Sequence, residues 1–162
     1  MLSELRFRQV GRFVAVAMMA GTIAACAGNK QIDDLAGGAA PGTAQDFVVN
    51  VGDRVFFEVD SSQLTGVATA TLDKQAAWLS RYSQYSVVIE GHADERGTRE
   101  YNIALGARRA AATRDYLVSR GVNRGRLRTI SYGKERPVAV CNDASCWTQN
   151  RRAVTTLNGA GS

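Results

Sequence analysis

The residues best suited to chemistry lie together between positions 89 and 117, in the stretch IEGHADERGTREYNIALGARRAAATRDYL. This stretch holds the single histidine of the chain, His92, together with Asp94, Glu95 and five arginines. Three kinds of site use such residues: a metal or catalytic centre, a nucleic-acid patch, and a pocket for another charged molecule. The rest of the chain helps to choose among them.

A metal or catalytic centre has the weakest support. His92, Asp94 and Glu95 make half of a metal-ligand set, but neighbouring side chains point apart and the chain has no second histidine. No serine or cysteine stands at a recognisable spacing from a base, and there is no glycine-rich phosphate loop. We therefore expect no enzyme activity, no cofactor and no metal, and a structural or hydrogen-bonding role for His92.

The N-terminus predicts export and lipid anchoring. A basic region with Arg6, Arg8 and Arg12 precedes an uncharged run over 13–25, which is short for a membrane span. The sequence IAAC at 23–26 resembles a lipobox, which implies cleavage before Cys26 and its acylation; several acyl chains give a stable anchor. Ala27 replaces the aspartate that retains many lipoproteins in the inner membrane, so the resemblance favours the outer membrane. An ordinary N-terminal helix is the alternative.

Composition divides the chain into three segments. We expect a signal peptide at 1–25, the lipidated cysteine and a flexible tether at 26–45, and one folded domain at 46–162. The tether is rich in glycine and alanine and has no hydrophobic period. Loss of residues 1–25 lowers the formal charge from +5 to about +3, and so small an excess in an exported protein argues against a nucleic-acid partner.

Two cysteines remain in the predicted domain, Cys141 and Cys146, in the sequence CNDASC. Four residues between them suit a small disulfide loop in an oxidising compartment. Zinc is disfavoured because the chain offers only one histidine. We expect a disulfide that pins a loop, with two free thiols as the alternative.

The hydrophobic pattern predicts an α+β fold. Strands are expected at 55–59, 86–91, 127–133 and 150–157, and helices at 69–82 and 99–120. The order βαβαββ predicts an α+β sandwich, with two main helices packed on one face of a mixed four-stranded sheet.

The long helix at 99–120 places two polar residues on its packing face. At 100° per residue, one stripe of this helix holds Asn102, Leu105, Gly106, Arg109, Ala110, Thr113, Tyr116 and Leu117. A buried guanidinium needs partners, and Asp94 in the preceding loop is expected to face Arg109. Either the two form an internal ion pair that orients the loop, or they present both signs of charge to a zwitterion, with Arg109 on its carboxylate and Asp94 on its ammonium.

These motifs resemble those of OmpA-like peptidoglycan-binding domains, in particular the peptidoglycan-associated lipoproteins. The sequence GHADERGTREYNIALGARRAAATRDYL carries the resemblance, and VFFEVDSS, RTISYGKERP and NRRAV extend it over about residues 53–157. The resemblance implies a non-catalytic pocket for the diaminopimelate side chain of the peptidoglycan stem peptide.

The resemblance also assigns roles to single residues. Asp94 and Arg109 match the acid and the arginine that hold the amino and carboxylate ends of diaminopimelate. Further matches are Asn102, which hydrogen-bonds in or beside the pocket, Leu105, against which the methylene chain rests, and Arg151, another basic contact. Supporting positions are Gly97, Thr98, Asn150 and Arg152. Glu58 stands where the family normally has aspartate, so its contact with ligand is left open.

The resemblance also implies partners. Peptidoglycan-associated lipoproteins bind the periplasmic protein TolB and belong to the Tol–Pal system, which ties the outer membrane to the cell wall and helps it to constrict at division. The resemblance thus implies an outer-membrane protein that is anchored by Cys26 and faces the periplasm; a surface-exposed anchor stays open. Alternatives are a TolB-binding adaptor with little wall affinity, favoured by Glu58, and a metal-dependent cell-wall hydrolase with the metal at His92.

Overall fold

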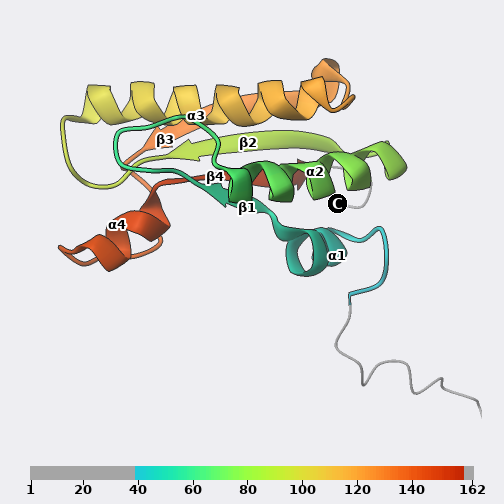
Figure 1. The fold of residues 1–162 in the computed structure, drawn as a ribbon, viewed down its shortest axis with the longest axis horizontal. Helices are drawn as coiled ribbons and strands as arrows, with labels where there is room; N and C mark the ends of the chain where they lie inside the picture. Colours follow the sequence, from blue (N-terminus) through green and yellow to red (C-terminus); the bar gives the residue numbers. More distant parts are fainter. Residues whose placement is uncertain (1–38, 159–162) are drawn as a thin grey trace, which may run out of the picture. The chain divides into compact units, whose positions relative to one another are not determined.

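The computed structural model describes residues 39–158, which contain one mixed sheet (Figure 1). Its strands are β1 (Arg54–Phe56), β2 (Ser86–His92), β3 (Leu127–Gly133) and β4 (Arg152–Asn158), in the order β1-β4-β2-β3. The β1–β4 and β4–β2 pairs are antiparallel, and the β2–β3 pair is parallel. The predicted α+β class with a mixed four-stranded sheet is confirmed.

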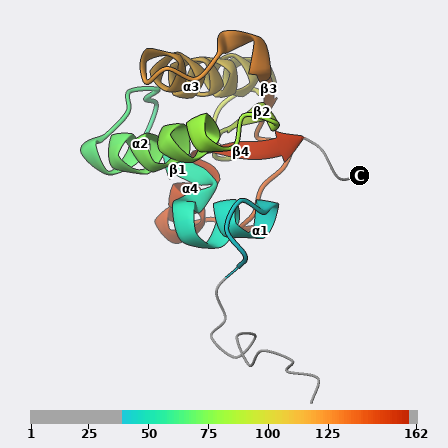
Figure 2. The same cartoon turned by 90° about the vertical axis from the view of Figure 1, so that its right-hand side faces the viewer.

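The two main helices are α2 (Gly66–Arg81) and α3 (Arg99–Ser119), and both lie on the same face of the sheet (Figure 2). Each begins at a threonine whose hydroxyl accepts a backbone N–H of the first turn, Thr65 for α2 and Thr98 for α3. Four short helical elements complete the described part: α1 (Ala44–Asp46), η2 (Phe47–Gly52), η3 (Arg124–Arg126) and α4 (Ala144–Asn150). Among residues 39–158, no helix combines the length and the apolar character needed to cross a bilayer.

The core lies between the helices and the sheet. Its fully buried side chains include Phe47, Leu72, Leu79, Ile89 and Leu117. The predicted stripe of α3 is buried as expected at seven of its eight positions, and Tyr116 is half-buried at the margin. Burial of Asn102 and Arg109 with the apolar members of the stripe means that two polar side chains reach the sheet side of the helix.

The first strand ends earlier than its sequence predicts. We expected a strand at 55–59, but β1 ends at Phe56. Side chains take the carbonyl oxygens that follow: Arg151 Nε donates to Phe57 at 3.0 Å, and Arg109 Nη2 donates to Glu58 at 3.1 Å. The backbone then turns through Asp60, whose φ of 54° is left-handed. The Phe57 N–H still donates to the Arg151 carbonyl at 2.9 Å, and beyond it these side-chain contacts hold the segment after β1 near α3.

Helix α4 was missed in the sequence, where Cys141 to Cys146 read as a loop. It is only seven residues long, and Asp143 caps it by accepting the backbone N–H of Ser145 at 2.7 Å.

At the other end of the domain, packing begins before the predicted boundary at residue 46. Gly42 N–H donates to Asp46 and the Gly42 carbonyl accepts from Tyr85 Oη, so residues of the predicted tether belong to the folded part. The predicted signal peptide and Cys26 lie outside the described residues.

Candidate binding site

A cavity of about 280 Å³ lies where the β2–α3 loop, the start of α3 and the segment after β1 meet. Its lining residues are Val59, Asp60, Asp94, Arg96, Gly97, Tyr101, Asn102, Leu105 and Arg109. Four of the predicted binding residues are therefore brought together here, namely Asp94, Asn102, Leu105 and Arg109. Charged and apolar side chains share the cavity, so it suits a molecule with both kinds of surface.

Asp94 is only 7 % exposed and is held by two arginines. Arg96 Nη2 lies 2.7 Å from Oδ2, and Arg151 Nη1 lies 3.3 Å from the same oxygen. Burial alone would raise the pKa of the Asp94 carboxyl, but the hydrogen bonds and charge of Arg96, with the bond from Arg151, outweigh it and hold this pKa below its usual range. Asp94 is therefore a carboxylate at neutral pH.

Arg109 is fully buried and donates to three carbonyl groups, two from the segment after β1 and one from the end of β2. Its Nε donates to Ser61 at 2.8 Å, its Nη1 to His92 at 2.8 Å and its Nη2 to Glu58 at 3.1 Å. Of the two alternatives, the internal Asp94–Arg109 ion pair is not formed in the described residues, because the partners of Asp94 are Arg96 and Arg151. Neutral carbonyls leave the charge of Arg109 uncompensated by direct contact, and two of the five N–H groups of its guanidinium have no hydrogen bond among the described residues.

The pKa of Arg109 follows from this environment. Burial, and then the charge of Arg151, lower it to about 10, while Asp94 and Asp60 act in the opposite direction. Arg109 thus keeps its proton at neutral pH. A buried cation that lines a cavity and has spare donors is a suitable partner for a carboxylate.

The loop between β2 and α3 is fixed by local hydrogen bonds. Gly97 has a left-handed φ of 85°, and Thr98 caps α3 by accepting the N–H of Tyr101 at 3.2 Å. Asn102 uses its amide N–H groups on the loop, donating to the carbonyls of Arg96 at 2.7 Å and Thr98 at 3.1 Å. Gly97 and Thr98, which were predicted to shape the loop, therefore have structural roles in it. Asn102 also holds the loop, through its two hydrogen bonds.

In the NRR segment, residues 150–152, Arg151 contacts Asp94, whereas Asn150 and Arg152 have supporting contacts. Arg151 contacts Asp94 and the carbonyl of Phe57, whereas Asn150 binds the backbone of Val138 and Ala139. Arg152 donates to the carbonyl of Arg136 at 3.2 Å. Asn150 and Arg152 thus hold the connection before α4 and the start of β4 and do not line the Asp94 cavity.

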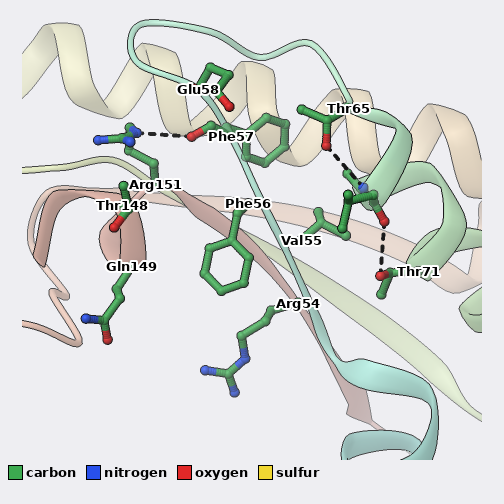
Figure 3. A pocket seen from close by; sticks show the side chains of 12 residues that line it. Arg54, Val55, Phe56, Phe57, Glu58, Thr65, Thr71, Thr148, Gln149 and Arg151 are labelled. Atoms are coloured by element: carbon green, nitrogen blue, oxygen red, sulfur yellow. Dashed lines mark hydrogen bonds between the residues drawn. The ribbon is translucent and has the colours of Figure 1, made fainter. Parts of the chain in front are cut away.

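A second, larger cavity of about 570 Å³ runs along β1 between α2 and α4 (Figure 3). Glu58 lines this cavity and is absent from the wall of the smaller one. Only the backbone carbonyl of Glu58 reaches the charged cluster, through Arg109. Arg151 also borders the larger cavity, where Figure 3 shows its bond to Phe57. The structure therefore places the side chain of Glu58 in a different cavity from Asp94, Asn102, Leu105 and Arg109.

His92 is buried at the end of β2 and is 2 % exposed. Its ring lies 5.5 Å from that of Tyr132, and both ring nitrogens lack a hydrogen-bond partner. Burial, followed by the charges of Arg152 and Arg136, lowers the pKa of His92 to about 4, so the ring is neutral at neutral pH. The backbone of His92 serves the site, because its carbonyl accepts from Arg109.

A second layer of contacts surrounds Asp94, and it was not predicted from the sequence. Arg96 packs over the Trp147 ring at 4.3 Å from its centroid, and Trp147 Nε1 donates to Glu95 Oε1 at 3.0 Å. Trp147 belongs to α4, just after the disulfide that joins Cys141 to Cys146. The position of Arg96, two residues after Asp94, could have indicated its contact with this carboxylate. The role of Trp147 could not be read from the sequence, because it depends on long-range packing.

Sequence similarity relates this chain to a known family. The sequence model of the OmpA family matches residues 56–152. The peptidoglycan-associated lipoprotein of Mesorhizobium japonicum is 65 % identical over 154 residues, which cover 91 % of this chain and 90 % of the relative. The chain belongs to the OmpA family, among the peptidoglycan-associated lipoproteins. Another relative in this group, from Brucella melitensis, is 64 % identical over 156 residues and covers 91 % of this chain and 93 % of its own.

Solved structures agree with the fold. The peptidoglycan-associated lipoprotein of Burkholderia pseudomallei has a TM-score of 0.64 and 40 % identity, covering 65 % of this chain and 90 % of that one. The C-terminal domain of Helicobacter pylori MotB has a TM-score of 0.62 at 21 % identity, covering 67 % of this chain and 85 % of that one. At that identity the MotB likeness supports the fold alone.

Proposed function

We propose that this protein is a lipid-anchored binding protein that ties the outer membrane to peptidoglycan without catalysis. In this proposal residues 1–25 are a signal peptide, acylated Cys26 is the anchor, residues 26–45 contain the tether, and the domain faces the periplasm. The ligand is the side-chain end of diaminopimelate in the stem peptide. The names of the relatives, which are peptidoglycan-associated lipoproteins, support the class of partner.

One observation carries the proposal: Asp94 and Arg109, two buried and oppositely charged side chains, line the same cavity. The free end of diaminopimelate bears an ammonium and a carboxylate on one carbon, joined to the peptide by methylene groups. Arg109 would bind the carboxylate, Asp94 the ammonium, and Leu105, which is 5 % exposed, would contact the methylene chain.

The balance of charge in the cluster favours a ligand that includes a carboxylate. The guanidinium groups of Arg96, Arg109 and Arg151 surround the single buried carboxylate of Asp94. The other acid in the cavity wall, Asp60, accepts a hydrogen bond from Tyr101 Oη. The cluster thus carries more positive than negative charge, which a carboxylate would compensate.

Co-sedimentation with isolated sacculi tests the function. The full-length protein in detergent should pellet with sacculi, and Asp94→Asn should weaken this binding by at least about tenfold, since it removes one charged hydrogen-bond acceptor. The matched control is Asp73→Asn, which alters an acid on α2 that pairs with Arg120 at 2.8 Å. Equal binding of the wild type and Asp94→Asn would refute the assigned site.

Many weak contacts suffice for such a role. The anchor confines each domain near the wall, and peptidoglycan repeats the same side chain, so a released domain rebinds from a high local concentration. The proposal therefore needs only an equilibrium between wall-bound and free domain. Through the family resemblance, it also includes TolB as a partner and a place in the Tol–Pal system at outer-membrane constriction.

A second candidate function is a TolB-binding adaptor with little affinity for the wall. The observation that favours it is the position of Glu58, which replaces the usual aspartate and lines the larger cavity. Sedimentation of the Glu58→Asp variant separates the two candidates. A large gain of wall binding in this variant would support the adaptor, whereas unchanged binding would support the wall anchor.

A further inference from the structure

The carboxylate of Asp94 has no acceptor position left for a ligand in this structure. Its Oδ1 accepts the backbone N–H of Arg96 at 3.2 Å and Arg96 Nε at 3.2 Å. Its Oδ2 accepts Arg96 Nη2 at 2.7 Å and Arg151 Nη1 at 3.3 Å. An ionised carboxylate offers about four lone-pair positions, and all four are occupied. An ammonium can reach Asp94 only if one of these donors leaves.

The side chain of Arg96 is the donor that is free to leave. It is 42 % exposed, whereas the side chain of Arg151 is 7 % exposed and is also bound to the carbonyl of Phe57. The backbone N–H of Arg96 is fixed by the loop. Departure of the Arg96 side chain would vacate one position on each carboxylate oxygen and would leave the other two bonds in place.

In the same conformation, Arg96 also contacts Trp147 beside the cavity. Its guanidinium carbon lies 4.3 Å from the centroid of the Trp147 ring, close enough for a cation–π contact. Glu95 supplies negative charge nearby and accepts a hydrogen bond from Trp147 Nε1. The indole and Glu95 could therefore keep Arg96 next to the site after it releases Asp94.

We propose that Arg96 is a specificity-determining residue of this site: its guanidinium occupies the ammonium position on Asp94 and leaves Asp94, while keeping its contact with Trp147, when ligand binds. The inference rests on the proposed function. The exchange replaces one cation by another, so Asp94 stays compensated throughout. A ligand with an ammonium but no carboxylate must displace Arg96 and gains nothing from Arg109. Ligands that carry both groups are thereby selected.

Two peptides that differ in one amino group test the exchange. The first is the tripeptide L-Ala-γ-D-Glu-meso-diaminopimelate, and the second has 2-aminopimelate as its third residue, which keeps the distal carboxylate and lacks the distal ammonium. Affinities are measured by calorimetry on the full-length protein in detergent. Arg96→Ala should bind the diaminopimelate peptide about tenfold more tightly than wild type, because the ammonium no longer displaces a charged hydrogen-bond donor. Its affinity for the aminopimelate peptide should not increase.

The control variants separate this effect from a general loss of charge or fold. Arg99→Ala removes an exposed arginine at the start of α3 that pairs with Glu135, and it should leave the ratio of the two affinities at the wild-type value. Arg96→Gln keeps a polar side chain on the loop and should shift the ratio in the same direction as Arg96→Ala. The NMR resonance of the Trp147 indole N–H should shift when the diaminopimelate peptide is added and should not shift with the aminopimelate peptide.

The outcomes also distinguish this inference from the proposed function. If Arg96→Ala and Arg96→Gln weaken both peptides equally, Arg96 binds ligand or orders the loop, and the inference fails while the function stands. If the ratio of the affinities for the two peptides were unchanged in both variants, the inference about Arg96 would also be overturned. If neither the wild type nor the variants bind either peptide or sacculi, the proposed function fails, and the inference fails with it.

Discussion

A Cβ atom on Gly91 would lie 1.8 Å from the carbonyl oxygen of Gly106, so strand β2 and helix α3 meet backbone to backbone at this point. The converse also holds, because a Cβ on Gly106 would lie 2.4 Å from Ser131 Oγ and 2.8 Å from the Gly91 carbonyl oxygen. Ser131 Oγ in turn donates to the carbonyl of Ile103 at 2.7 Å. This close approach brings the first half of α3, with Arg109, against the end of β2.

Gly91→Ala should therefore destabilise the domain. A methyl group at this position cannot be accommodated by a flexible side chain, because its nearest neighbour is backbone. We expect the free energy of unfolding, measured by urea denaturation, to fall by about 1–3 kcal/mol or more. The control is Gly66→Ala at the start of α2, where a Cβ meets nothing within 4 Å, and it should be neutral or slightly stabilising. Equal stability of the two variants would contradict the close contact.

The stability of the domain should fall between pH 6.5 and pH 4 because of His92. The folded state holds the pKa of His92 at about 4, below its ordinary value of 6.5, so the unfolded chain binds the proton first as the pH falls. The loss is on the order of 3 kcal/mol over this window. His92 is the single histidine of the chain, so one imidazole resonance in NMR should titrate near pH 4. In the His92→Gln variant this part of the pH dependence should be absent.

Arg109→Lys should damage both the fold and the proposed site although it keeps the charge. An ammonium cannot reproduce the planar fork that serves the carbonyls of Ser61, His92 and Glu58, so buried acceptors lose their partners. We expect the free energy of unfolding to fall by about 2 kcal/mol or more and wall binding to be lost. Arg108→Lys, at the exposed neighbouring position, should change neither quantity. A stable Arg109→Lys domain that pellets with sacculi would refute this account of Arg109.

Reduction of the Cys141–Cys146 disulfide should cost stability and weaken wall binding modestly. The two cysteines are five positions apart, so closing the small loop stabilises the folded state by about 2 kcal/mol in the chain-entropy estimate. The bond also lies next to Trp147, whose ring contacts Arg96. Denaturation of oxidised and reduced protein measures the first effect, and sedimentation with sacculi measures the second. The Cys141→Ser/Cys146→Ser variant, which cannot respond to reductant, is the control.

Periodic segments were the part of the fold that the sequence could predict. Helix α3 was expected at 99–120 and spans Arg99–Ser119, because its apolar residues repeat with a helical period and Thr98 provides a cap. The strand expected at 127–133 coincides with β3. The burial of Arg109 also followed from helical phase alone, since the phase of a long helix fixes which side chains face the sheet.

The partners of those buried side chains depended on contacts between distant segments. Helical phase placed Arg109 on the packing face, but its bonds to Ser61 and Glu58 require the segment after β1 to turn toward α3. Likewise, Asp94 is bound by Arg151 from 57 positions away in the sequence. No local pattern carries such information. The short helix α4 was missed for a related reason, because seven residues cannot show a hydrophobic period.

Arg151 links the two cavities of the domain. Its Nη1 binds Asp94 in the wall of the smaller cavity, and its Nε binds the carbonyl of Phe57 beside the larger one. Because a guanidinium is a rigid plane, a molecule that rotates Arg151 from the larger cavity also changes the bond to Asp94. Thermodynamic linkage then requires the reverse, so that occupants of the two cavities would change each other's affinity by the same factor. The two cavities thus share one rigid side chain in their surroundings.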